Sequence, residues 1–336
     1  MTQELLATLQ KNFPLTSKPF EQLANEFNIP QQQLLSLLQE QKDAGVIRQT
    51  SAIFDTKRLG YTSSLVAFKV DPSRIEEVSK IINSHPGVSH NYEREHEFNL
   101  WFTIAVAPDS KLGLDKTVQA LAKMCDIEHY IILPTLKLFK IAVKLDTTGK
   151  AKKKEKVNLA KHKQIELTQL HRDVIKLLQY DIEFTKEPFK PAIEQLGIDY
   201  DTLFAVLNEL KEAGYMRRFA TILNHRRAGF SANAMVVWEI EDDKAQQAGA
   251  TAAEFSAVSH CYLRPKYDNW PYNLFTMIHG KTQDETNAVI AEIAQTLQTD
   301  SYRPLYSSRE FKKQRIEYFI PAFSEWEEQY LQGATQ

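Results

Sequence analysis

The feature that most constrains the fold is an internal repeat. Matching residues of two similar segments lie 169 positions apart, as in Pro19 and Pro188, Ala44 and Ala213, and Gly60 and Gly229. The spacing grows to 170 at His90 and His260 and to 174 at Asn99 and Asn273, so the second copy carries a four-residue insertion around 268–271. The 336 residues are therefore expected to form two homologous halves, each long enough for one to two small domains.

Each half begins with a helical segment. In the first half, apolar residues recur with helical spacing over 4–13, 20–27 and 31–44, with Pro19 and Pro30 near helix starts and Gly45 after the last helix. Residues 46–61 alternate weakly and predict a small hairpin, so this unit is interpreted as a winged helix-turn-helix. The second half repeats it, with helices expected at 164–179, 188–196 and 200–213.

The remainder of each half has the order βαββαβ, which is the ferredoxin-like pattern. In the first half the expected elements are strand 63–70, helix 73–84, strands 88–95 and 98–106, helix 111–123 and strand 129–143. The second copy spans about 231–315. The predicted fold class is thus α+β, a tandem duplication of winged helix and ferredoxin-like domains, with boundaries at 1–60, 61–145, 164–229 and 230–336 and a lysine-rich linker at 146–163.

Composition excludes several classes of protein. The net charge of −2 and pI near 6.5 give no bulk electrostatic reason to expect nucleic acid. The two cysteines, Cys125 and Cys261, have neither disulfide-framework nor metal-site spacing. No stretch approaches 18 uninterrupted apolar residues, and the N-terminus lacks the pattern of a signal peptide, so we expect a cytoplasmic protein without a membrane partner.

A winged helix followed by a ferredoxin-like domain is the layout of the Lrp/AsnC transcription regulators, so DNA binding has to be tested first. The expected recognition helix of the second half carries Asp199, Asp201, Glu209 and Glu212 against Lys211 alone, and that of the first half has only Glu40, Lys42 and Asp43 as charged residues. A helix in the major groove needs side chains that donate hydrogen bonds to phosphates and base edges. Sequence-specific DNA binding is therefore not expected.

Two long strings concentrate the unusual chemistry, VSHNYEREHEFNLWFTI from Val88 and VSHCYLRPKYDNWPYNLFTMI from Val258. Alternate residues of a strand share a face. The strings therefore predict one row of His90, Tyr92, Arg94 and His96, and a second row of His260, Tyr262, Arg264 and Lys266. Guanidinium and imidazole groups beside aromatic rings suit a flat, aromatic, polycarboxylated ligand.

Together with the late YSSREFKKQRIEYF, these strings resemble the siroheme decarboxylases, divergent relatives of the Lrp/AsnC regulators. The resemblance spans nearly the whole chain, which is similar to the fused form of a two-subunit enzyme. It implies the removal of CO2 from two acetate side chains of siroheme, on the way to heme d1 or to heme by an alternative route. It also implies an internal pseudo-dimer, with a larger homo-oligomer left open.

Loss of CO2 from a pyrrole acetate requires an acid, because the electrons left behind must flow into a protonated ring. His260, with Tyr262 supporting it, is the predicted acid, since imidazole exchanges protons near neutral pH. Arg264 and Lys266, with the first row, are expected to bind carboxylates, while Trp270 and Tyr272 cover the macrocycle and His279 also contributes to substrate binding. His260 or His96 is the candidate axial ligand of the substrate iron, and no added cofactor is required because the reaction changes no oxidation state.

Alternatives stay open at this level. The second half is favoured as the main site, but the first row either forms a second site or completes the same one. For any single histidine on a sheet, the non-functional alternative is a structural residue held by hydrogen bonds. Two other functions compete with decarboxylation: a regulator that responds to a tetrapyrrole or an amino acid, and a carrier that only binds and relays the tetrapyrrole.

Overall fold

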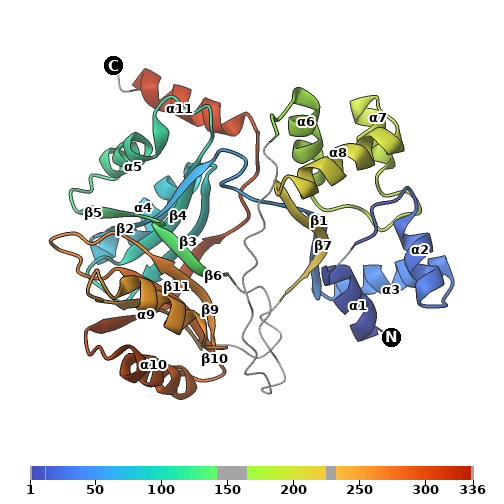
Figure 1. Cartoon of the computed structure of the whole chain (residues 1–336). Helices are drawn as coiled ribbons and strands as arrows, with labels where there is room; N and C mark the ends of the chain where they lie inside the picture. Colours follow the sequence, from blue (N-terminus) through green and yellow to red (C-terminus); the bar gives the residue numbers. More distant parts are fainter. Residues whose placement is uncertain (1, 12, 142–164, 225–231, 334–336) are drawn as a thin grey trace. The chain divides into compact units, whose positions relative to one another are not determined.

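The structure is a computed structural model that describes residues 2–11, 13–141, 165–224 and 232–333 (Figure 1). Its contacts divide these residues into two compact units, each containing the corresponding parts of both halves. The helical unit holds residues 2–61, 165–224 and 317–321, and the β-rich unit holds 62–141, 232–316 and 322–333. The predicted linker 146–163 lies outside the described residues.

Aromatic residues from both halves form the core of the helical unit. The ring of Phe13 packs against those of Phe20, Phe189 and Phe219, at centroid distances of 5.6, 6.3 and 5.1 Å. Thr168 caps the first helix of the second half, which is why that helix starts later than its apolar pattern suggests. The helices of this unit are α1 (Thr2–Lys11), α2 (Pro19–Glu26), α3 (Gln31–Asp43), α6 (Gln169–Leu178), α7 (Lys190–Leu196) and α8 (Tyr200–Glu212).

The predicted hairpin at 46–61 is wrong. Only one strand forms there, β1 (Ile47–Phe54), and it pairs antiparallel with β7 (Met216–Leu223) of the second half. The two strands come from homologous segments of equal length, and Thr50 and Thr221 meet across the pair with their hydroxyls 2.8 Å apart. The backbone hydrogen-bonding groups of each copy's wing strand are thus paired with the strand of the other copy, and not with a second strand of the same copy.

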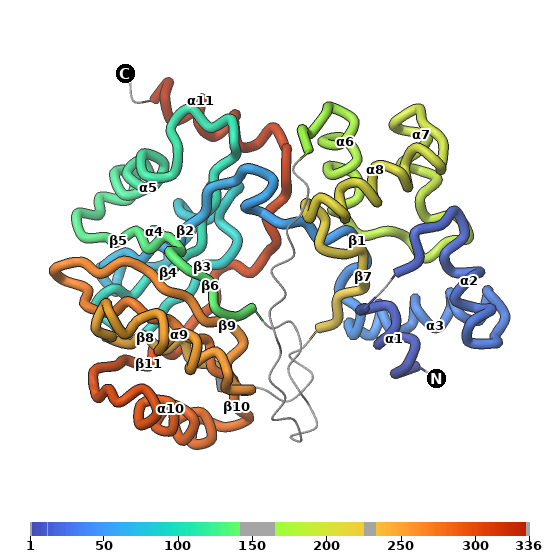
Figure 2. The backbone as a smooth tube through the Cα atoms, viewed as in Figure 1, coloured from blue at the N-terminus to red at the C-terminus, as the bar shows by residue number. Residues whose placement is uncertain are grey.

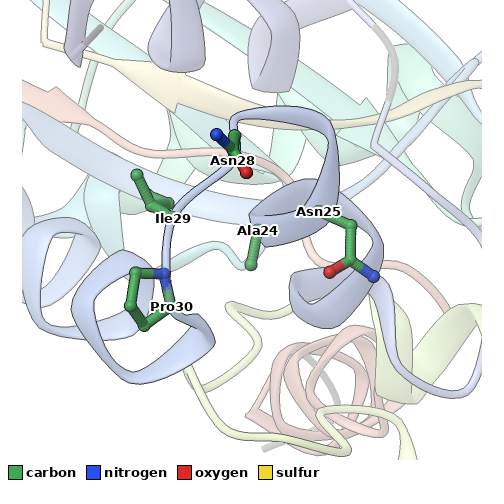
Figure 3. A pocket seen from close by; sticks show the side chains of 5 residues that line it. All are labelled: Ala24, Asn25, Asn28, Ile29 and Pro30. Atoms are coloured by element: carbon green, nitrogen blue, oxygen red, sulfur yellow. The ribbon is translucent and has the colours of Figure 1, made fainter.

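An open surface pocket of ≈ 270 Å³ lies at the turn between α2 and α3 (Figure 3). Its lining consists of Ala24, Asn25, Asn28, Ile29 and Pro30. Because no ionisable side chain lines it, this pocket is a poor place for acid–base chemistry.

The β-rich unit contains two ferredoxin-like halves joined in one nine-stranded sheet, in the order β5-β2-β4-β3-β11-β8-β10-β9-β6. The strands are β2 (Thr62–Phe68), β3 (Val88–Arg94), β4 (Leu100–Val106), β5 (Tyr130–Pro134), β6 (Lys137–Ile141), β8 (Ala232–Trp238), β9 (Val258–Leu263), β10 (Leu274–Gly280) and β11 (Tyr302–Lys313). The helices are η1 (Pro72–Arg74), α4 (Ile75–Ser84), α5 (Gly113–Met124), α9 (Ala245–Ala253), α10 (Gln283–Leu297) and α11 (Ala322–Gly333).

The predicted single strand 129–143 is two strands with partners in different halves. β5 pairs with β2 of the first half, and β6 pairs with β9 of the second half (Figure 2). Thr135 and Leu136, between them, are not in strand conformation. β11 makes the reciprocal connection, because its beginning pairs with β8 and its end with β3. β5 and β6 are the two end strands of the sheet and only two residues separate them, so the two ends of the sheet meet at this point, and in this sense we call the sheet closed.

The closed sheet has apolar residues on both faces. Its outer face packs against α4, α5 and α11 in the first half and against α9 and α10 in the second. We call the residues that pack on its inner face the interior cluster: Ala67, Phe98, Trp101, Ile131, Leu133, Met235, Val237, Trp270, Phe275 and Leu305. Along the ranges the structure describes, no helix has the length and apolar character needed to cross a membrane.

Candidate functional site

The two predicted rows lie on the inner face of the closed sheet. We call His90, Tyr92 and Arg94 of β3 the first row, and His260, Tyr262 and Arg264, from β9 and its end, the second row. Tyr92 lies opposite Trp101 of β4, and Tyr262 lies opposite Phe275 of β10, so both rows face the interior cluster. Within each row the imidazole and phenol rings stack, with centroids 6.2 Å apart in the first and 6.1 Å in the second.

The arginines of the two rows occupy equivalent, buried environments. Nη1 of Arg94 donates to the backbone oxygen of Leu305 at 2.7 Å, and Nη1 of Arg264 donates to that of Leu133. The guanidinium carbon of Arg94 lies 5.4 Å from the Tyr92 ring, and that of Arg264 lies 4.9 Å from the Tyr262 ring. Burial lowers the pKa of both guanidinium groups to about 10, and the neighbouring tyrosines offset this only in part.

The interior holds hydrogen-bond donors without acceptors. Arg94 is 7 % exposed and Arg264 8 % exposed, yet among the described residues no carboxylate pairs with either, and Nε of each has no hydrogen-bond partner. Nε1 of Trp270 is likewise buried and unpartnered. Buried charges are normally paired and buried donors normally satisfied. Three unmatched donors facing one interior are the property expected of a site for an anionic ligand.

The histidines of the two rows are close enough to interact. Burial lowers the pKa of His260, and the charge of His90 lowers it further. The structure thus brings both rows to one interior.

A hydrogen-bonded chain lies behind His260. Its Nδ1 is 2.8 Å from Oγ of Ser259, the same oxygen is 2.6 Å from Nε2 of His279, and Nδ1 of His279 is 2.6 Å from Oδ1 of Asn233. Burial first, and then the charges of His260 and Lys313, lower the pKa of His279 to about 4. His279 is therefore neutral near pH 7, with both ring nitrogens engaged by protein groups.

Other predicted site residues lie elsewhere. Lys266 follows the end of β9 and does not continue the second row; its Nζ contacts the oxygen of Ile240 at 2.7 Å and Oδ1 of Asp242 at 3.0 Å. His96 lies in the turn after β3, where Nδ1 accepts a hydrogen bond from the backbone of Phe98 and burial lowers its pKa.

Trp270, which was predicted to cover the macrocycle, lies in the interior and not on the surface. Its side chain is 1 % exposed and packs in the interior cluster, with its ring 5.3 Å from Trp101 and 5.4 Å from His96. The inserted segment forms a tight turn, in which the backbones of Tyr267 and Trp270 are paired by two hydrogen bonds. Tyr272 is half-buried beside it, at 5.0 Å.

The strands that cross between the halves add residues that the sequence patterns did not reveal. β6 places Leu138 opposite Tyr262 and Ile141 opposite His260, and both side chains are exposed. β11 places Glu310 opposite Tyr92 and Lys313 opposite His90. The second row is therefore flanked by apolar side chains and the first by charged ones.

Other basic residues of β11 lie on the outer face of the sheet or are exposed to solvent. Arg309 pairs with Glu76 and Glu93, and Nζ of Lys312 contacts the backbone oxygen of Asn83. Arg303 is exposed, and its charge contributes to the lowered pKa of His96. Among the residues described, no cluster of three or more His, Cys, Asp or Glu side chains has the geometry of a metal site.

Comparison with known proteins agrees with this geometry. A family model for the AsnC-like ligand binding domain matches residues 58–140 and 227–312, and one for the siroheme decarboxylase NirDL-like HTH domain matches 2–48. The siroheme decarboxylase of Hydrogenobacter thermophilus is 40 % identical over 96 % of both chains. The siroheme decarboxylase beta subunit of Methanosarcina barkeri is 42 % identical over 42 % of this chain and 92 % of its own.

A solved structure extends the similarity to the whole fold. The crystal structure of the siroheme decarboxylase NirDL in complex with an iron-uroporphyrin III analogue superposes with a TM-score of 0.81, at 34 % identity and over 99 % of both chains. Similarity of this level and coverage leaves one conclusion: the chain belongs to the siroheme decarboxylase family.

Proposed function

We propose that this chain is a non-oxidative carboxy-lyase that removes CO2 from two acetate side chains of siroheme and yields didecarboxysiroheme. The observation that carries the proposal is the pair of buried arginines, each without a carboxylate partner and each beside a tyrosine and a histidine. A buried unpaired guanidinium destabilises the ligand-free protein, and a carboxylate that enters the interior relieves this cost.

Arg94 and Arg264 bind carboxylates that stay on the macrocycle, through Nε and the charge of the guanidinium group. The indole N–H of Trp270 is a third donor to the same ligand. Lys313, beside His90, supplies a further positive charge at the first row. Fixing the retained carboxylates in this way orients the macrocycle before any bond breaks.

The leaving acetate lies at the second row, beside the apolar side chains of Leu138 and Ile141, which are exposed in the ligand-free protein and are covered once the macrocycle binds. A carboxylate in such surroundings loses hydration, which favours its departure as neutral CO2. In each step the bond between the methylene and carboxyl carbons breaks, its electron pair flows into the protonated macrocycle, and one proton ends on the new methyl group. His260 lends the ring proton and takes it back, with Tyr262 supporting it, and the proton on the methyl group is a second one that comes from solvent, so each CO2 lost consumes one proton overall.

The electron balance asks for no redox partner, so we propose that the protein needs no resident cofactor. The iron is part of the substrate. Of the two candidates for its axial ligand we favour His96, through Nε2 because Nδ1 already accepts from Phe98; His260 would have to use the same Nε2 that exchanges the proton. The product is consistent with heme d1 formation and with the alternative heme route. We propose that the reaction takes place in the cytoplasm. The two halves form an internal pseudo-dimer, which is compatible with further assembly into a homo-oligomer.

The regulator alternative has no added support. The first turns of α8 carry Asp199 and Asp201, and a groove-binding helix with this charge is repelled by DNA phosphates. A carrier function would leave the half-buried acid–base pair of His260 and Tyr262 without a task.

Anaerobic incubation with siroheme tests the proposal. Mass spectrometry is expected to show a mono-decarboxylated species and then a product that has lost two carboxyl groups as CO2. An iron porphyrin that carries propionates but no acetates is the matched control and should remain intact. Siroheme that stays unchanged, or that is bound and released unchanged, would reject decarboxylation in favour of the carrier.

A further inference from the structure

The two histidine rows differ in one respect that bears on proton transfer. Both histidines contact the serine that precedes them, Ser89 at 3.0 Å in the first row and Ser259 at 2.8 Å in the second. In the second row the serine also contacts His279. The corresponding position of the first half is Ala105, since the amides of Ala105 and His279 donate to the equivalent carbonyls of Gly87 and Ala257.

The strand partners differ in the same way. His279 lies opposite Asn233 in β8, whereas Ala105 lies opposite Ser63 in β2. The second half therefore has a polar pair, His279 and Asn233, where the first has an alanine and a serine.

Hydrogen-bond donors and acceptors fix the direction of this chain. Oδ1 of Asn233 only accepts, so Nδ1 of His279 carries a proton and, in the neutral ring, Nε2 of His279 accepts. The hydroxyl of Ser259 donates to that Nε2 at 2.6 Å; the other acceptor in reach, the backbone oxygen of Met277, is 3.5 Å away. A lone pair of the same hydroxyl then accepts from Nδ1 of His260.

We infer that His279, acting through Ser259, is a positioning residue that holds His260 in the tautomer with the proton on Nδ1 and leaves Nε2 of His260 as the proton-exchanging atom. This inference rests on the proposed decarboxylation and makes the second row the proton-transferring one. In the first half Ala105 stands at the equivalent position and offers no imidazole to Ser89, so we assign the first row to anchoring the substrate.

The tautomer is measured without any substrate. In protein with ¹⁵N-labelled histidine, the ring nitrogen shifts of His260, assigned from the spectrum of the His260→Gln variant, should show the proton on Nδ1. The His279→Ala and Ser259→Ala variants should both move this signal toward the other tautomer. A wild-type His260 with its proton on Nε2 would overturn the inference, whatever the protein does to siroheme.

Kinetics on siroheme distinguish positioning from substrate binding. General acid–base catalysis contributes about 10²- to 10⁴-fold, and loss of tautomer control should forfeit part of this, about 10- to 100-fold in kcat, with KM nearly unchanged. His279→Gln offers a side-chain oxygen to Ser259 and should retain more turnover than His279→Ala. The exposed His129 gives the matched control, since His129→Ala should leave both constants as in the wild type.

The double variant separates one chain from two independent roles. If His279 acts through Ser259, the losses in the two single variants should not multiply when combined. Multiplying losses, or a raised KM with unchanged kcat in His279→Ala, would contradict the inference. A wild-type protein that leaves siroheme unchanged rejects the proposed function, and the tautomer measurement still decides the inference.

Discussion

The buried guanidinium of Arg264 yields the sharpest quantitative prediction, because it should weaken the empty protein and strengthen the complex. Its pKa of about 10, against 12.5 for a free guanidinium, corresponds to about 3 kcal/mol of unfavourable charge burial. The Arg264→Met variant removes this cost. It also removes the hydrogen bond to Leu133 and the contact with Tyr262, together about 2–4 kcal/mol.

These terms nearly cancel, so the free energy of unfolding of Arg264→Met without ligand should lie within about 1 kcal/mol of the wild type. Affinity should change far more. Loss of charge-assisted hydrogen bonds to a carboxylate, about 1.5–3 kcal/mol, predicts siroheme binding weaker by about 10- to 150-fold. Urea unfolding of the ligand-free protein and a Soret titration with siroheme measure the two quantities.

The matched control is Arg309→Met. This arginine is ion-paired on the outer face with Glu76 and Glu93, so the variant should leave siroheme affinity unchanged. An Arg264→Met protein that unfolds several kcal/mol more easily while binding siroheme as tightly as the wild type would show that the arginine is a structural residue. The reasoning about unmatched donors would then be wrong.

Three further predictions follow from single contacts. Trp270→Phe keeps a ring in the interior but deletes the unpartnered N–H, so siroheme affinity in the same titration should fall by about 1–2 kcal/mol, and an unchanged value would remove Trp270 from the binding site. Lys313→Gln should weaken binding mainly at low salt, because its charge lies at an exposed strand end; a loss independent of salt would contradict this. His85 is buried against Trp326, and burial lowers its pKa to about 3, so the unfolded chain takes up the proton first as pH falls through about 6.5. Between about pH 7 and about pH 5 the free energy of unfolding of the wild type should therefore fall by about 2 kcal/mol more than that of His85→Gln. Equal losses in the two proteins would refute the burial argument.

The alternation of residues in the two motif strings was sufficient to predict that His, Tyr and Arg share a face, because the period of a strand is a local property. The ferredoxin-like order and the duplication were equally visible, since they depend on apolar spacing and on matching positions. The family comparison confirms that fold class.

The pairing of strands between halves could not be predicted in this way. β1 meets β7 and β6 meets β9 across more than a hundred residues of sequence, and nothing in a single strand identifies so distant a partner. The same limit hid Leu138, Ile141 and Lys313, which reach the rows only because their strands cross between the halves.

The surroundings of Trp270 and His279 could not be predicted for a different reason. Polar neighbours in the inserted turn suggested an exposed indole, whereas the turn folds the ring inward onto Trp101. His279 is connected to His260 by the hydroxyl of Ser259. Ser259 lies at an irregularity in the pairing of β9 with β10. A regular strand pattern gives no sign of such an irregularity.

A structure of the protein with siroheme bound tests the central claim most directly. The account predicts macrocycle carboxylates on Nε of Arg94 and Arg264, with an acetate-bearing ring within hydrogen-bond reach of Nε2 of His260. Siroheme bound away from the inner face of the sheet, with both guanidinium groups still contacting only backbone oxygens, would contradict it.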